Sequence, residues 1–287
     1  MQIELVADYS CATGEGPLWH PDEGAVYWTD IPAGRLFRLE AAAGRHALIY
    51  QDRPVGGFTL QADGSLLLFR DRGNVVVWRD GAVIRTVIAE VPELSGTRFN
   101  DVCADPEGRV FCGSMKGPAV NGRLYRLDPD GSLHRLLDDQ GTPNGMGFSP
   151  DLRRFYYNDS GVARTWVFDY DRATGALTNQ RLFRDAAAAG DPGKPDGLAV
   201  DAAGNVWTAR WDGGALLRFD PAGRLLARIE MPARKTSALC FAGAGLADLY
   251  VTTAGGGKRD VEGPAAGALF RVRGGGVQGL PRFRSRI

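Results

Sequence analysis

Histidine and cysteine are scarce in this chain of 287 residues, which holds three of the first and four of the second. The cysteines form no C-x-x-C pair, and no histidine lies near them at zinc-finger spacing, so we expect free and mostly buried thiols in a reducing compartment: they are Cys11, Cys103, Cys112 and Cys240. Three histidines are too few for a histidine-rich metal site, and no G-x-S-x-G nucleophile motif occurs.

The chain also lacks a long apolar run and an excess of either charge. No stretch of 18 or more apolar residues occurs, so no transmembrane helix is expected. The opening residues MQIELVADYS contain no basic region followed by an apolar stretch, so we expect no secretory signal and a cytoplasmic protein. Lysine plus arginine and aspartate plus glutamate number 34 each, a balance that favours neither nucleic acid nor an anionic membrane as partner.

What the chain does contain is a repeat. A short apolar segment that ends in a turn recurs six times at intervals of roughly 40 to 50 residues, a spacing typical of β-propellers: PLWHPDEG, FTLQADG, VCADPEG, MGFSPDL, LAVDAAG and ALCFAGAG. Each copy is followed by two further apolar runs of strand length, rich in Val, Leu, Phe, Tyr and Trp and separated by Gly, Pro, Asp and Asn. No stretch shows a sustained period of 3.6 residues.

These repeats predict an all-β fold, a six-bladed β-propeller that occupies residues 1–287 as a single domain and surrounds a central channel. Fourth strands are expected at 46–51, 82–90, 133–139, 177–183 and 224–231. The last blade is expected to take residues 3–9 as its outer strand, which would hide an open sheet edge, although 277–283 could serve instead. The basic tail 283–287 is expected to be a frayed end.

Aligning the repeats on their first strand reveals a polar column. Equivalent positions carry Glu15, Gly56, Asn100, Asn144, Asp196 and Thr236. Because the first strand of each blade is innermost, these positions form a ring around the channel. Two carboxylates and two carboxamides on one axis offer oxygen ligands suited to a hard divalent cation. A single Asn-Gly or Asp-Gly pair is an ordinary turn signal. The prediction of a cation site therefore depends on the equivalent positions that these residues occupy in different repeats.

At these residues the chain resembles the senescence marker protein/gluconolactonase family, also known as the regucalcin-like family. The motifs lie in the same order along nearly the whole chain: GEGPLWHPDEGAVYWTDI, RFNDVCADPEGRVFCGSM, PNGMGFSPDLRRFYYNDS, PDGLAVDAAGNVWTARWDGG and KTSALCFAGAGLADLYVTTA. The resemblance implies a six-bladed propeller with one divalent ion in the channel, which is Ca²⁺, Zn²⁺, Mn²⁺, Mg²⁺ or Fe²⁺ in different members. It also implies metal-dependent hydrolysis of sugar lactones, as a gluconolactonase-like lactonase.

Site residues follow from the resemblance, position by position. The metal ligands correspond to Glu15, Asn144 and Asp196, and the substrate-binding pair of the R-x-N-D motif corresponds to Arg98 and Asn100. Asp196 is the candidate general base, because it is a carboxylate beside the expected ion.

Three further residues have open roles. Asp101 is expected to give structural support, Lys116 is a substrate contact or a solvated loop residue, and Asp159 supports the site or caps its loop. The loop SMKGPAVNGRLY lacks the acidic residues of vertebrate members, which leaves the substrate preference open.

Two other functions fit the same fold. A phosphotriesterase-type hydrolase would use the ion on a phosphoryl oxygen and would have a more apolar mouth with no need for Arg98. A non-enzymatic calcium-binding propeller would present its surface to partners. The expected partner is a small-molecule sugar lactone, and because a closed propeller has no obligatory partner we expect a monomer.

Overall fold

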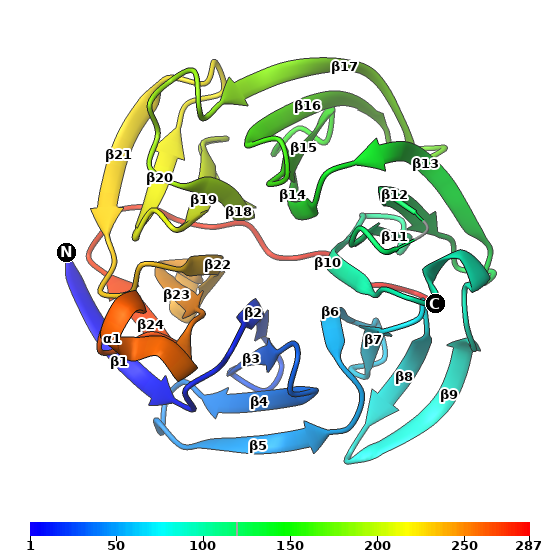
Figure 1. Ribbon diagram of the computed structural model, residues 1–287, viewed down its shortest axis with the longest axis horizontal. Coiled ribbons are helices and arrows are strands. Elements are labelled where there is room, and N and C mark those ends of the chain that lie inside the picture. Colours follow the sequence, from blue (N-terminus) through cyan, green and yellow to red (C-terminus); the bar gives the residue numbers. More distant parts are fainter. Residues whose placement is uncertain (119) are drawn as a thin grey trace.

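The computed structural model of the chain describes residues 1–118 and 120–287. Within these ranges the strands form six four-stranded antiparallel sheets, arranged as blades around a central axis (Figure 1). The predicted six-bladed β-propeller is therefore confirmed. In five blades the chain starts at the innermost strand and moves outward strand by strand, whereas in the sixth the outermost strand is the first strand of the chain.

The first three blades follow the chain in order. Blade 1 consists of β2 (Gly14–His20), β3 (Ala25–Asp30), β4 (Arg35–Glu40) and β5 (His46–Gln51). Blade 2 consists of β6 (Val55–Leu60), β7 (Leu66–Arg70), β8 (Val75–Arg79) and β9 (Ala82–Ile88). Blade 3 consists of β10 (Phe99–Ala104), β11 (Val110–Ser114), β12 (Gly122–Leu127) and β13 (Leu133–Gln140).

The remaining blades complete the ring. Blade 4 consists of β14 (Pro143–Phe148), β15 (Arg154–Asp159), β16 (Arg164–Asp171) and β17 (Ala176–Asp185). Blade 5 consists of β18 (Lys194–Val200), β19 (Val206–Trp211), β20 (Ala215–Phe219) and β21 (Leu225–Glu230). Blade 6 consists of β22 (Thr236–Ala242), β23 (Asp248–Thr253), β24 (Ala268–Arg273) and β1 (Gln2–Asp8). Between β23 and β24 lies a four-residue helix, α1 (Arg259–Glu262).

The ring is closed by the first strand of the chain. β1 pairs with β24 in an antiparallel register that places Leu5 opposite Phe270, and Glu4 forms an ion pair with Arg271 at 2.7 Å. The predicted closure by residues 3–9 is therefore confirmed, and 277–283 add no strand to the blade. Pairing of β1 with β24 covers a sheet edge that would otherwise present unpaired backbone groups.

The turn after each inner strand needs a left-handed backbone, and five of the six copies place glycine there. Gly24, Gly64, Gly108, Gly204 and Gly243 all have positive φ. Blade 4 has Leu152 at the equivalent turn, with φ of 57°, where a side chain carries a steric cost. The turn positions of the repeat thus share a positive φ, although the turn of blade 6 differs because Gly243 has a ψ of −171° and precedes a short 3-10 helix.

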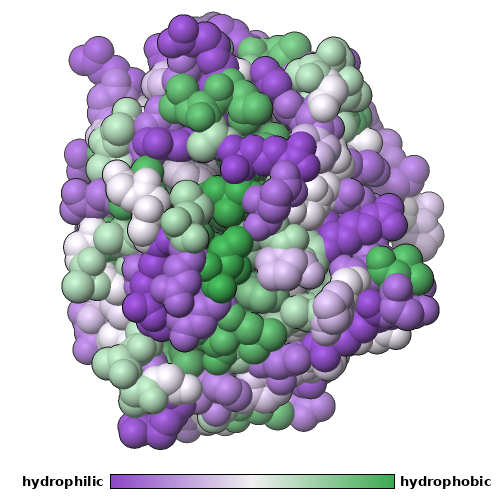
Figure 2. Space-filling view, turned by 90° about the vertical axis from the view of Figure 1, so that its left-hand side faces the viewer, coloured by the Kyte–Doolittle hydropathy of each residue, from purple (hydrophilic) through white to green (hydrophobic). Residues whose placement is uncertain are grey.

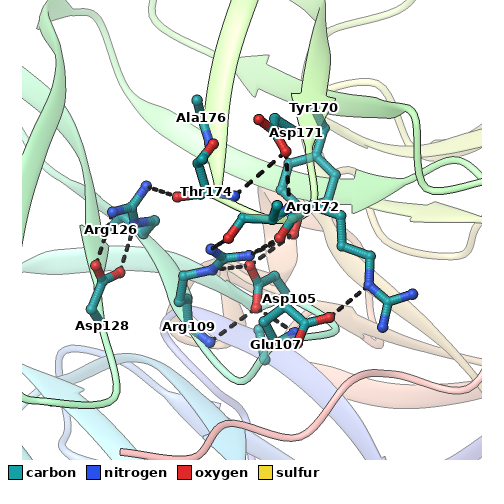
Figure 3. A network of polar contacts seen from close by, with 12 residues as sticks. Asp105, Glu107, Arg109, Arg126, Asp128, Tyr170, Asp171, Arg172, Thr174 and Ala176 are labelled. Carbon is teal, nitrogen blue, oxygen red and sulfur yellow. Dashed lines mark hydrogen bonds and ion pairs between the residues drawn. The ribbon is translucent and has the colours of Figure 1, made fainter.

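Neighbouring blades are joined by apolar clusters and, between blades 3 and 4, by a buried polar network (Figure 3). Asp105 is fully buried; its Oδ2 accepts hydrogen bonds from Arg109 Nε at 2.5 Å and Tyr170 Oη at 2.8 Å. Arg109 also donates to the backbone of Arg172 on blade 4. The buried carboxylate of Asp105 thus has a charged partner in its own blade and a hydroxyl donor from the next blade.

On the side of blades 5 and 6, hydrophilic residues surround a group of apolar ones near the middle of the face (Figure 2). Among the described residues, no helix is both long enough and apolar enough to cross a membrane. The cysteines are free thiols as predicted: Cys11, Cys112 and Cys240 are buried and Cys103 is half-buried.

The last ten residues correct one prediction. Residues 283–287 are not a frayed end: Ser285 is fully buried, its backbone pairs with Gln61, and its Oγ lies 2.7 Å from Thr59 Oγ1. In Figure 1 this red segment runs from blade 6 across the middle of the ring to the opposite side. We call residues 278–287 the C-terminal strap. Its sequence has no alternating apolar pattern, because it binds turns rather than joining a sheet.

Candidate active site

The inner strands are bulged where the polar column begins. The antiparallel register shifts between Glu15 and Leu18 in β2, and equivalent shifts occur in the other inner strands. Asn100, Asn144 and Asp196 fall inside these shifts and have no partner in the register of the neighbouring strand. A bulge turns a side chain away from the regular alternation of a strand. The local fold therefore directs the polar column toward the axis.

Glycine permits the close approach of these strands. A Cβ on Gly145 would lie 2.1 Å from the backbone nitrogen of Leu198, and one on Gly197 would lie 2.5 Å from Ala238 Cα. At position 16 glycine is favoured for a different reason, because the backbone has a φ of +57°, which other residues rarely adopt. Gly56 leaves the ring position of blade 2 without a side chain, because a Cβ there would lie 1.9 Å from the Phe99 carbonyl oxygen. The polar column is thus concentrated on four blades.

These side chains open into a cavity of about 220 Å³. It is lined by the five site residues expected from sequence, Glu15, Arg98, Asn100, Asn144 and Asp196, and by Thr13, Ile31, Met115, Thr142, Ser160, Gly161, Lys194 and Trp211. Lys116 is exposed and Asp159 is buried, and neither is among the lining residues. In the loop 114–125, Ala119 lies outside the described residues. Asp101 lines a narrower void of about 30 Å³ deeper in the channel.

A chain of hydrogen bonds links the site residues across three blades. Arg98 Nη1 donates to Asn100 Oδ1 at 2.7 Å, and Asn100 Nδ2 donates to Asn144 Oδ1 at 3.0 Å. Asn144 Nδ2 donates to Ser160 Oγ at 2.8 Å, and this hydroxyl donates to the carbonyl oxygen of Pro195 at 2.5 Å. The chain orients both amides, so that each oxygen has a defined direction.

Sequence reasoning missed the residues that support this chain. Ser160 couples Asn144 to the backbone beside Asp196, and Asn158 Nδ2 donates to the Asp196 carbonyl oxygen at 2.7 Å. Both belong to the segment YYNDS at the end of the second strand of blade 4, where only Asp159 was singled out. Asp159 accepts hydrogen bonds from the backbone amides of Gly141, Thr142 and Gly161, which fixes the loop before Asn144.

Two carboxylates in the cavity lack a cationic partner. Glu15 and Asp196 are almost completely buried, at 4% and 3% exposure, and no basic side chain of the described residues lies within ion-pairing distance of either. Burial raises the pKa of Glu15 well above its usual range, and the charges of Asp196 and Asp101 raise it further. Burial and the charge of Asp101 likewise raise the pKa of Asp196. Such a pair is unfavourable until a cation joins it.

The donor set suits a divalent ion that prefers oxygen. Glu15 and Asp196 supply anionic oxygens, and the Asn144 amide oxygen has a second lone pair free beside the Asn100 contact. Within residues 1–118 and 120–287, no group of three or more His, Cys, Asp or Glu side chains could hold a metal. A cation here would therefore depend on the mixed carboxylate and amide set, which leaves coordination positions open for small molecules.

Two arginines carry positive charge near the pair. Arg98 lines the cavity, and burial lowers its pKa, although the charges of Glu15, Asp101 and Asp196 oppose this shift. Arg210 lies behind Asp196, where Nε donates to the Pro192 carbonyl oxygen at 2.9 Å. Burial lowers the pKa of Arg210 to about 10. Arg98 thus faces the cavity, whereas Arg210 holds the loop that leads into β18.

Comparison with known proteins places this geometry in context. The chain is 44% identical to a pentonolactonase of Haloferax volcanii, over 100% of this chain and 99% of that protein. It is 35% identical to regucalcin of Danio rerio, over 99% and 98% of the two chains. Among solved structures, a luciferin-regenerating enzyme matches with a TM-score of 0.90 and 26% identity, over 100% and 99% of the two chains. A calcium-binding regucalcin of Agrobacterium tumefaciens matches with a TM-score of 0.87 and 29% identity, over 99% and 96%. Residues 13–255 match the family described as the SMP-30/gluconolactonase/LRE-like region, and the chain belongs to this family.

Proposed function

We propose that this protein is a metal-dependent lactonase that opens sugar lactones in the cavity at the start of the inner strands. The observation that carries the proposal is the unpaired couple of Glu15 and Asp196 beside Arg98 in one cavity. The 44% identity to a pentonolactonase over the full length of both chains supports it. A pentonolactone or a hexonolactone is small enough for a cavity of about 220 Å³.

Glu15, Asn144 and Asp196 would hold the divalent ion. When bound, such an ion polarises a carbonyl and lowers the pKa of water, the two requirements of ester hydrolysis at neutral pH. Burial raises the pKa of both carboxylates, whereas a bound cation would favour their deprotonated form, so ion binding and the charge state of the site are coupled.

Arg98 and Asn100 would bind and orient the lactone. The guanidinium has donors beyond the one that it gives to Asn100, and these can reach the ring oxygen or the hydroxyls of a sugar. Asn100 is fixed by its own bonds to the Pro143 carbonyl and to Asn144, so its oxygen holds the guanidinium at 2.7 Å. Orientation of this kind lowers the entropic part of the barrier.

Asp196 is the proposed proton acceptor. No hydrogen bond among the described residues reaches its carboxylate, so both oxygens are available to the ion and to a water molecule at the cavity. Water would attack the lactone carbonyl directly, and the proton accepted by Asp196 would pass to the alkoxide that ring opening releases, which stays attached to the sugar acid. A covalent intermediate is therefore not required. Accordingly, no serine and histidine pair is needed near the cavity.

The polar walls favour a lactone over a phosphotriester. Arg98 and Lys194 both line the cavity, together with Thr13, Thr142 and Ser160. A site for neutral, apolar phosphotriesters would be expected to replace these groups by apolar ones.

The experiment is an assay of proton release from pentonolactones and hexonolactones by metal-stripped protein, with Ca²⁺, Mg²⁺, Mn²⁺, Zn²⁺ or Fe²⁺ added back. We expect turnover that depends on the ion and falls by at least about 10³-fold in Asp196→Ala. The matched control is Asp201→Asn, a buried carboxylate directly after the other end of the same strand. Ion binding without turnover of any lactone would contradict the lactonase proposal and favour a calcium-binding protein.

A further inference from the structure

The C-terminal strap touches every blade at the end of the channel opposite the active-site cavity. Each inner strand starts at the active-site cavity and ends in the turn that leads to the second strand of its blade. The strap binds these turns or the residues beside them. Its contacts include Asp22, Leu60, Gly108, Phe148, Asp201 and Leu246, one from each of blades 1 to 6 in order. The carboxyl-terminal Ile287 is held by Gln61 and Arg85. The strap is therefore a fixed part of the channel.

Between the strap and the inner strands lies a second cavity of about 340 Å³, larger than the active-site cavity. We call it the far chamber. Most of its walls are apolar, and they include Phe58, Met146, Phe148, Leu198, Phe241 and Phe283. An apolar concave space of this size lies in the range that small-molecule ligands occupy. Water gains few hydrogen bonds in such a space, so an apolar group that displaces it is favoured.

Arg282 is the one charged residue among the described residues that line the far chamber. It also lines the narrow void that contains Asp101. Its only hydrogen bond to the described protein is a long one, from Nη2 to the Leu239 carbonyl oxygen at 3.4 Å, and no described carboxylate lies within ion-pairing distance. Arg282 is an exposed residue, so its other donors face solvent or the far chamber, and its charge opposes the rise in the pKa of Asp101 across the narrow void. Arg284 on the same strap is instead paired with Asp22 at 2.7 Å.

The far chamber has binding groups but no catalytic ones. Its described walls contain no histidine and no carboxylate, and burial raises the pKa of the Cys103 thiol to about 11, so this thiol is neutral and a poor nucleophile at neutral pH. Thr59 Oγ1 lies against Ser285. The remaining charged group is the guanidinium of Arg282, at the edge of the apolar far chamber.

From this arrangement we infer that the far chamber is a second binding site, for a small monocarboxylic acid with an apolar body. The carboxylate would pair with the free guanidinium donors of Arg282, for which a planar two-oxygen anion is the matching shape. The aliphatic or aromatic body would lie among Phe148, Phe241 and Phe283. This inference does not depend on the lactonase proposal, because the acid and the lactone occupy opposite ends of the channel.

The test is calorimetric titration of the metal-loaded protein with octanoate, with 1-octanol and butyrate as probes of the separate parts. We expect saturable binding of one octanoate per chain with a negative heat-capacity change, and weaker binding of both probes. Arg282→Gln should raise the Kd for octanoate about tenfold or more and leave 1-octanol nearly unchanged. The control variant is Arg284→Gln, which removes a strap arginine outside the far chamber.

A second variant separates loss of the site from loss of the fold. Leu280→Trp enlarges a half-buried side chain in the chamber wall and should abolish octanoate binding without lowering the melting temperature by more than a few degrees. The inference is overturned by equal octanoate affinity in Arg282→Gln and the unmutated protein, or by the absence of saturable binding. It is also overturned if octanoate binding survives Leu280→Trp but is lost in Arg98→Gln, because the acid would then occupy the active-site cavity.

Discussion

The two ends of the channel are built from the same six strands and have opposite character. Where the strands begin, bulges turn Asn144 and Asp196 toward the axis beside Glu15, and charged and amide side chains gather in the cavity. Where the same strands end, regular alternation brings apolar side chains such as Met146 and Phe148 to the axis, and the C-terminal strap covers them. A short local change in strand register is thus enough to separate a site for charge from a site for apolar groups.

Removal of the strap should have the largest effect on stability and a small effect on the polar end. A chain that ends at Val277 loses the packing of Phe283 and the buried contacts of Ser285. We expect the free energy of unfolding to fall by about 3–5 kcal/mol. Denaturant unfolding measures this loss, and ion titration should give a Kd within about threefold of the full chain. A large loss of ion affinity would show that the two ends are not independent.

Arg98→Ala should damage the polar end without affecting the fold. Loss of charge-assisted contacts to the lactone is expected to lower kcat/KM by about 10²- to 10³-fold, or about 3–4 kcal/mol. Lactone kinetics at saturating metal measure the change. Arg284→Ala, at the opposite end, should keep kcat/KM within about threefold. Similar losses in both variants would remove the distinction between the ends.

Ser160→Ala tests the support beneath the ion site. Its hydroxyl joins Asn144 to the Pro195 carbonyl, so its removal frees the amide that should bind the ion. We expect the Kd for the divalent ion to rise about tenfold, as measured by calorimetry. Ser149→Ala is the matched control, because Ser149 carries a buried hydroxyl and directly follows the far end of β14, the strand that holds Asn144. An unchanged Kd in Ser160→Ala would mean that Asn144 is positioned by Asn100 alone.

The smallest expected effect is a pH dependence confined to the polar end. Because the pKa values of Glu15 and Asp196 are raised in the ion-free folded protein, this form binds more protons than the unfolded chain and loses stability as pH rises above about 4. The ion binds the deprotonated carboxylates, so the gain in melting temperature on adding the ion should grow between pH 4.5 and 7.5. The double variant Glu15→Gln, Asp196→Asn should show almost no gain at either pH.

Sequence predicted the blades and the polar column because both depend on repetition. The turn glycines recur at one register, and even Leu152, which breaks the residue pattern, keeps the left-handed turn. The ring positions from Glu15 to Asp196 follow from the same alignment. Ser160 and Asn158 were missed because they occur in one blade only, so no repeat marks them.

The end of the strap, residues 283–287, was expected to be frayed for a related reason. Residues such as Arg284 and Ser285 are hydrophilic and have no strand periodicity, which is the pattern of a solvated end. These residues are held in place by contacts with turns that are distant in sequence, such as the turn that contains Gln61. Contacts of that kind become visible only after the ring has been assembled.

Closure of the ring by β1 sets an order of events during synthesis. Glu4 finds its partner Arg271 only after 267 further positions have been made. At about 5–20 residues per second, the opening strand is without its sheet for roughly 13–50 s. Blades 1 to 5 can form meanwhile, but the last sheet and the strap wait for the end of the chain. A ribosome that stalls within the last blade therefore holds a propeller with one open edge and an uncovered channel, a species that chaperones would be expected to bind.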